Sequence, residues 1–219
     1  MSSARDEILA RLAKGRREPL PVAEAYTAPP AGADMLSKFV RGLEKVMATN
    51  ELITDASQLA ESVESYLLQH NAGRELVVTE AIRQAGLLDN SSLQLLDAPT
   101  RGNEISAITM AYAGIAETGS LVLLSGADTP VTTNFLPDNF ICVLKESDVL
   151  NDMESLWARM ASEKRKMPRS VNLITGPSRT ADVEQIIQMG AHGPRRVHVI
   201  LLDQKYRGTN AAPGKFTPT

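Results

Sequence analysis

The sequence predicts an α/β fold with a mostly parallel sheet, and three observations support this prediction. Apolar runs at 121–124, 140–144 and 197–202 lack polar alternation, which is typical of strands buried on both faces. Segments with helical periodicity lie between such runs. No two-residue hairpin signal of the Asn-Gly kind separates them. With 219 residues, 43% of them hydrophobic, the chain is long enough to bury one sizeable core.

The first predicted element is an amphipathic helix over 5–14. Ile8, Leu9 and Leu12 fall on one stripe of this helix, with charged residues opposite. Residues 15–33 contain four prolines and no periodicity, which indicates an extended arm. A helix on such a tether cannot bury its stripe alone, so we expect it to dock on the main body or on another chain.

The main α/β domain is predicted to span 34–203, after the helix and Pro-rich arm of 1–33 and before a loose tail over 204–219. Helical periodicity predicts helices over 34–48, 57–69, 81–85, 153–164 and 181–189. Apolar runs predict strands over 51–54, 75–79, 92–96, 121–124, 140–144, 171–175 and 197–202. Segment 105–115 shows no strand alternation and is expected to be helical or irregular, and 125–134 is expected to be a polar loop.

The composition argues against nucleic-acid binding and against a metal centre. The net charge is −3 and aromatic residues make up 4%, so neither a basic field nor base-stacking platforms are available. The single cysteine, Cys142, lies in an apolar run and is expected to be a buried, unreactive thiol. His70, His192 and His198 lack metal-ligand spacing. We therefore expect no metal, no iron–sulfur cluster and no other cofactor in this chain.

The N-terminal segment does not predict secretion or membrane insertion. It is charged throughout and lacks the apolar stretch of a signal peptide. No window of the sequence approaches the roughly 18 uninterrupted apolar residues of a membrane span. We expect a cytoplasmic protein with no membrane span.

The first segment with residue types suited to chemistry is 111–121, which leads into a predicted strand. It contains Glu117, followed by Thr118, Gly119 and Ser120. A carboxylate held close to a substrate by a glycine turn can act as a nucleophile or general base. Alternatively, Glu117 caps backbone donors and its neighbours merely form the turn. Spacing alone leaves both interpretations open.

The second segment follows the strand predicted at 171–175 and comprises Gly176, Pro177, Ser178, Arg179 and Thr180. A helix is expected to begin near Arg179 or Thr180. Backbone N–H groups at a helix start, beside hydroxyls and a guanidinium, favour binding of a small carboxylate or phosphate. The alternative is a capped helix with a salt bridge from Arg179.

A third motif places His192 in a Gly-rich turn at 190–194, where it either bonds a backbone carbonyl or faces a ligand. Ligands of open α/β sheets bind at the carboxyl ends of the strands, so we expect the three motifs to converge there. Glu117 is the candidate catalytic base and His192 a proton-handling neighbour, with residues 118–120 and 176–180 binding the ligand. A structural Glu117–Arg179 ion pair is the rival account.

Together these motifs resemble the lactate-utilisation protein C family, the LUD domain. The resemblance is carried by Ala116-Glu-Thr-Gly-Ser-Leu-Val122, Thr175-Gly-Pro-Ser-Arg-Thr-Ala-Asp-Val-Glu184, Gly190-Ala-His-Gly-Pro194 and the strand leading to Asp203, and it covers roughly 34–203. It implies a three-layer α/β/α sandwich similar to the sugar-phosphate isomerase and coenzyme A transferase superfamily. In type I transferases of that superfamily a Glu before a Gly is the nucleophile, a place comparable to that of Glu117.

The resemblance also implies a function. The family is associated with oxidation of L-lactate to pyruvate alongside two partner proteins that carry iron–sulfur clusters. This predicts a non-cluster accessory subunit of a lactate-utilisation system. Two alternatives remain open: an enzyme of the coenzyme A transferase or isomerase kind that uses Glu117, and a binding module for a small anionic ligand.

Overall fold

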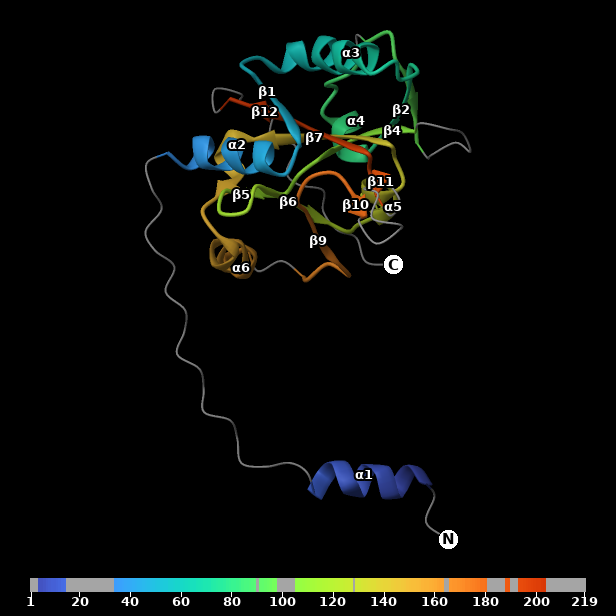
Figure 1. Cartoon of the computed structure of the whole chain (residues 1–219), viewed down its shortest axis with the longest axis vertical. Helices are drawn as coiled ribbons and strands as arrows, with labels where there is room; N and C mark the ends of the chain where they lie inside the picture. Colours follow the sequence, from blue (N-terminus) through green and yellow to red (C-terminus); the bar gives the residue numbers. More distant parts are fainter. Residues whose placement is uncertain are drawn as a thin grey trace.

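The computed structural model describes residues 4–14, 34–89, 91–97, 105–127, 129–163, 166–180, 188–189 and 193–203. Its centre is a six-stranded sheet in the order β1-β12-β7-β4-β2-β3, in which every neighbouring pair is parallel (Figure 1). The strands are β1 (Thr49–Ile53), β12 (Arg196–Leu202), β7 (Asn139–Lys145), β4 (Ser106–Met110), β2 (Glu75–Val78) and β3 (Gln94–Leu96). The prediction of an α/β fold with a mostly parallel sheet is confirmed.

One face of this sheet is covered by α3 (Leu59–Gln69) and α4 (Glu80–Gln84). A short 3-10 helix, η1 (Ala56–Gln58), leads into α3, and Asp55 and Gln58 form a capping box at its start. Side chains of α3 and α4 pack on the β-branched residues of the central strands, which are Ile108, Ile141, Val143 and Ile200. This burial of apolar area is the main driving force for forming the layer.

The opposite face carries α2 (Met35–Lys45) together with a second sheet (Figure 1). That sheet has the order β8-β5-β6-β9, with β8 (Val149–Leu150), β5 (Ala113–Ile115), β6 (Ser120–Leu124) and β9 (Val171–Ile174). Phe39 and Leu43 of α2 and Leu121 of β6 are fully or almost fully buried against β7 and β12. Cys142 of β7 lies in this cluster and is fully buried, as expected from the sequence.

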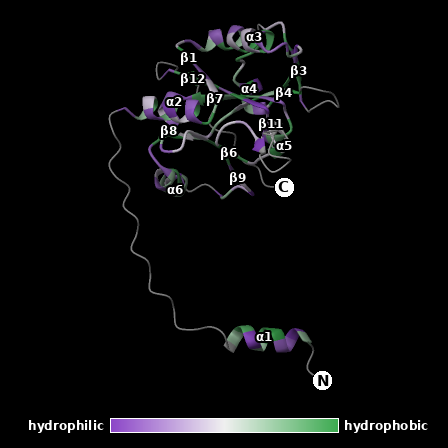
Figure 2. Ribbon diagram, in the orientation of Figure 1, coloured by the Kyte–Doolittle hydropathy of each residue, from purple (hydrophilic) through white to green (hydrophobic). Residues whose placement is uncertain are grey.

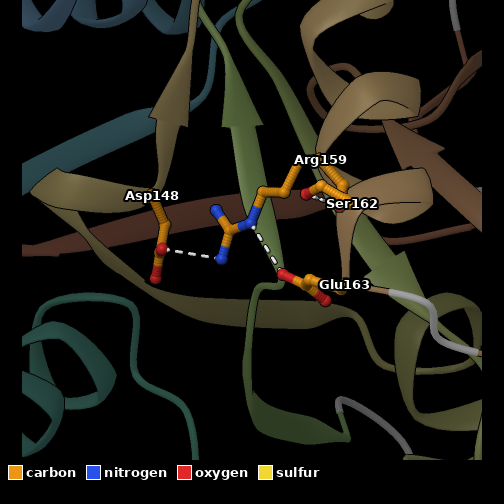
Figure 3. A network of polar contacts seen from close by, with 4 residues as sticks. All are labelled: Asp148, Arg159, Ser162 and Glu163. Atoms are coloured by element: carbon orange, nitrogen blue, oxygen red, sulfur yellow. Dashed lines mark hydrogen bonds and ion pairs between the residues drawn. The ribbon is translucent and has the colours of Figure 1, made fainter.

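The outer face of the second sheet is covered by α6 (Met153–Ser162), whose Leu156 and Met160 are buried against β5 and β6. Arg159 of α6 reaches back to the segment η2 (Glu146–Asp148) that precedes β8. Its guanidinium lies 2.9 Å from Asp148 and 3.2 Å from Glu163 (Figure 3) and stacks over the Tyr112 ring at 4.6 Å. This half-buried network fastens α6 to the second sheet.

Several predicted elements are confirmed. The helices expected over 34–48, 57–69, 81–85 and 153–164 correspond to α2, η1 with α3, α4 and α6. All seven predicted strands are present, with ends shifted by one or two residues. The loop expected at 125–134 contains the start of a short helix, α5 (Val131–Phe135), which leads to β7.

The expectation of helical or irregular structure at 105–115 is wrong, because this segment forms β4 and β5. β4 is a central strand with both faces buried, so its sequence carries no alternation. β5 and β6 form an antiparallel hairpin through a turn at 116–119, where Gly119 adopts a φ of 68°. The strand predicted at 121–124 therefore belongs to the second, mostly antiparallel sheet.

The prediction of a helix over 181–189 is also wrong for the two residues of this range that the structure describes. Gln188–Met189 forms the strand β11, which pairs antiparallel with β10 (Arg179–Thr180). Residues 181–187, the arm at 15–33 and the tail at 204–219 lie outside the described residues.

The helix predicted over 5–14 is present as α1 (Ala4–Lys14). Figure 2 shows hydrophobic and hydrophilic residues alternating along it. Ile8, Leu9 and Leu12 are 58%, 52% and 67% exposed, so no described residue buries the stripe. No helix among the described residues is long and apolar enough to cross a membrane.

A buried histidine lies between the parallel sheet and α3. The His198 ring stacks on Tyr66, with centroids 4.3 Å apart, and its Nδ1 lies 2.8 Å from Thr49 Oγ1. Its Nε2 has no hydrogen-bond partner and faces Glu51 Oε2 at 3.9 Å. Burial lowers the pKa of His198 to about 4, although the charge of Glu51 raises it and that of His70 lowers it further.

We expect the protein to lose stability in acid through His198. Since its folded-state pKa lies below the ordinary 6.5, the unfolded chain takes up this proton more readily. The contribution of neutral His198 is complete above pH 6.5 and is lost as the pH falls towards 4, by up to about 3 kcal/mol. Denaturant unfolding across this range measures the effect. His198→Phe keeps the stack on Tyr66 and should remove this part of the pH dependence, so an unchanged profile in the variant would contradict the assignment.

Candidate functional site

The turn at 116–119 and the segment after β9 meet at one end of the second sheet. β6 pairs antiparallel with β9, with Leu121 opposite Ile174, so the start of one strand adjoins the end of the other. Ser120 Oγ lies 2.7 Å from Thr175 Oγ1 and 2.6 Å from Thr118 Oγ1. These three side chains form one hydrogen-bonded hydroxyl chain, buried at Ser120 and exposed at both ends.

Helix α2 crosses this end of the sheet and holds both segments. A Cβ on Gly42 would lie 2.7 Å from Gly119 Cα, and one on Gly119 would collide with the Gly42 backbone. One helical turn later, a Cβ on Gly176 would collide with the Val46 carbonyl. Gly119 and Gly176 have φ values of 68° and 79°, in the left-handed region that favours glycine. Glycine at these positions therefore permits the backbone contact that positions the hydroxyl chain.

Glu117 lies at the exposed tip of the turn. Its backbone N–H donates to Asn151 O at 3.0 Å, which anchors the turn to the segment after β8. Its carboxylate forms no hydrogen bond or ion pair with any described residue. The structural Glu117–Arg179 ion pair is therefore absent, and so is the capping role for this side chain among these residues. Glu117 is exposed and directly precedes Thr118 of the hydroxyl chain in the sequence.

The anion site predicted at 176–180 lacks its main feature. Arg179 and Thr180 are in the strand β10, so no helix begins there to offer a fan of N–H donors. The Ser178 N–H is used by the Pro194 carbonyl at 2.8 Å. Pro177 is buried, whereas the Arg179 side chain is exposed. Pairing of β10 with β11 decides this conformation against the helix that the Gly-Pro turn suggested.

The expected location of the site is corrected too. Residues 118–120 and Gly176 do come to one place, but at the ends of antiparallel strands in the second sheet rather than at the carboxyl ends of the parallel one. His192 lies outside the described residues, so its predicted role stays a prediction. Thr175 was not predicted as a site residue. Its only sequence signal is a hydroxyl directly after an apolar strand.

Among the described residues, no group of three or more His, Cys, Asp or Glu side chains is placed to hold a metal ion. The Cys142 thiol sits in mid-strand with no exposed surface, and burial raises its pKa well above the usual range. The groups at the turn and the end of β9 that could take part in chemistry are therefore the hydroxyls of Thr118, Ser120 and Thr175 and the carboxylate of Glu117.

Residues 36–202 match the sequence profile of the LUD domain, a range that contains α2, both sheets and the hydroxyl chain. This chain belongs to the LUD domain family. Its relatives include "Lactate utilization protein C" of Anoxybacillus flavithermus, 29% identical over 163 residues that make up 69% of this chain and 73% of the relative. The protein of the same name from Geobacillus thermodenitrificans is 28% identical over 194 residues, 78% of this chain and 80% of the relative.

The LUD domain fold is also found in a solved structure. A crystal structure of a DUF162 family protein from Deinococcus radiodurans matches 80% of this chain and 99% of its own, with a TM-score of 0.58 and 22% identity. At that identity the likeness shows the fold alone. It agrees with the α/β architecture described above.

We expect Gly42→Ala to destabilise this LUD domain. Helix propensity alone would make alanine stabilising by about 1 kcal/mol at this interior position of α2. The new Cβ enters the Gly119 backbone, however, and overpacking of this kind typically costs about 1–3 kcal/mol. Gly73→Ala is the matched control, because its Cβ would meet nothing within 4 Å. Urea unfolding of both variants measures the difference, and a Gly42→Ala protein as stable as the control would show that the contact does not constrain the fold.

Proposed function

We propose that this LUD domain protein is a component of an L-lactate utilisation system that converts lactate to pyruvate, acting as an accessory subunit without a cluster of its own. The observation that carries the proposal is the LUD domain match over residues 36–202, together with relatives named for lactate utilization that align with 69% and 78% of this chain. The conversion removes an electron pair from the substrate, so the system must contain an electron acceptor.

The environment of Cys142 supports placing that acceptor outside this chain. Iron–sulfur clusters are held by several cysteine thiolates. This chain has one cysteine, and its thiol is fully buried with a pKa raised by burial. Clusters are therefore assigned to partner proteins, and the LUD domain contributes positioning or assembly.

The exposed stripe of α1 supports association with such partners. An amphipathic helix that buries its apolar residues on no described part of its own chain suits a helix-in-groove contact, in which a few apolar side chains anchor the helix. Ile8, Leu9 and Leu12 are the anchors of this contact.

The proposal is tested by growth and by iron content. A strain lacking the gene should fail to grow on L-lactate as sole carbon source and grow normally on pyruvate, with growth restored by the intact gene. A complex purified from lactate-grown cells through this subunit should contain iron, whereas the isolated subunit should not. Cys142→Ala should leave the iron content of the complex unchanged. Normal growth of the deletion strain on lactate would refute the role in lactate utilisation. Stoichiometric iron in the isolated chain would refute the assignment of the clusters to partner proteins.

A second candidate function, catalysis by Glu117, is favoured by two observations: Glu117 is exposed, and its carboxylate has no partner among the described residues. Glu117→Gln separates the two functions, since it keeps the shape and removes the charge. Glu44→Gln, at an exposed position of α2, is the matched control. A Glu117→Gln protein that folds and assembles but fails to support growth on lactate would establish the enzyme function, whereas full growth would leave the accessory role.

We expect replacement of Ile8, Leu9 and Leu12 by alanine to weaken association without altering the α/β body. These side chains are already more than half exposed, so the melting temperature should change by no more than a few degrees. Glu7→Ala with Arg11→Ala, on the polar side of α1, is the control. The measurement is the amount of iron–sulfur protein, identified by mass spectrometry, that co-purifies with each variant. Equal recovery with both variants would show that α1 does not carry the contact.

A further inference from the structure

We propose that Thr175 completes a ligand site with Thr118 and Ser120, and that their hydroxyl chain binds a small 2-hydroxy carboxylate across its two exposed ends. The inference rests on the proposed function for the choice of ligand and adds that this subunit itself contacts the substrate. It is carried by the two short contacts that join residues of β6 and β9.

The two ends of the hydroxyl chain present different hydrogen-bonding groups. Each hydroxyl has one proton, and the two links of the chain use two of the three. Ser120 is buried, so it must donate to one neighbour and accept from the other. One exposed end therefore has a proton to donate outward, and the other end has only lone pairs to offer. The hydroxyl chain therefore suits a ligand that has both a hydrogen-bond acceptor and a hydrogen-bond donor.

Glu117 decides which end is which. Glu117 is exposed and directly precedes Thr118 in the sequence, so its negative charge favours a donor over an anion at the Thr118 end. A ligand hydroxyl is therefore bound at the Thr118 end, and a ligand carboxylate accepts the outward proton of Thr175. The chain then runs from Thr118 through Ser120 to Thr175, and binding at one end favours binding at the other because aligned hydrogen bonds polarise one another.

The site is held in place before any ligand binds. The Gly42–Gly119 contact and the Val46–Gly176 contact fix both segments on α2. The two end oxygens are at most about 5 Å apart, since each lies within hydrogen-bond distance of Ser120 Oγ. In a 2-hydroxy acid the hydroxyl and the nearer carboxylate oxygen are close neighbours, so one molecule can bridge both ends. Little conformational entropy remains to be lost on binding.

The experiment uses the full chain and two probes, L-lactate and propionate, which differ by the hydroxyl. Amide chemical-shift changes in NMR titrations give the dissociation constants. The intact protein should bind L-lactate about tenfold more tightly than propionate. Thr118→Val should remove this preference for L-lactate, whereas Thr175→Val should weaken the binding of both probes about tenfold. Thr175→Ser should restore binding. Thr129 is the control position, because its hydroxyl donates to Leu124 O and takes no part in the hydroxyl chain; Thr129→Val should change neither dissociation constant.

Failure of the intact protein to bind either probe at millimolar concentration would overturn the inference, as would equal affinity for both. Retention of the preference in a folded Thr118→Val protein would also overturn it. A structural tie between the loops predicts instead that Thr175→Val lowers the melting temperature and leaves affinity unchanged. The growth test is independent of this experiment. If the protein is required for growth on lactate but binds neither probe, the accessory role is supported and the ligand site is refuted.

Discussion

The backbone contact between Gly42 and Gly119 is the constraint on which the layer above the parallel sheet depends. It lets α2 lie directly on the turn of the β5–β6 hairpin, closer than any side chain would allow. The same helix buries Phe39 and Leu43 against β7, so it is attached to both sheets at once. The second sheet is thereby held at a fixed place over the first, with the start of β6 and the end of β9 under the last turns of α2.

The residues that form the apolar core and the residues of the candidate site lie in different parts of the molecule. The parallel sheet lies between two clusters of buried apolar side chains, whereas the hydroxyl chain lies on the second sheet. The buried polar cluster of the parallel sheet, around His198, is enclosed by Tyr66 and Thr49. Its neutral imidazole is part of the packing. Glu117, Thr118 and Thr175, by contrast, are exposed to solvent at the edge of the molecule.

Membership of the LUD domain family gives these features a common interpretation. The buried thiol of Cys142 and the exposed apolar stripe of the amphipathic helix α1 are the two features that support the proposed role beside electron-carrying partners. In the proposed assembly, α1 would supply the contact with the partner and the second sheet would bind the ligand. An exposed site also makes sense in an assembly, because a partner that covers it would exclude water and strengthen its hydrogen bonds.

The sequence by itself determined the fold class and most elements. Continuous apolar runs identify β7 and β12, and helical periodicity identifies α2, α3 and α6, because burial imposes these patterns on local sequence. It also singled out Glu117, Thr118 and Ser120.

Only the tertiary structure decided the rest. β4 and β5 carry no alternation, and Arg179 became a strand residue through pairing with β11. Thr175 joins Ser120 across 55 residues because two strands pair antiparallel, and no local pattern records which distant strand a segment will choose.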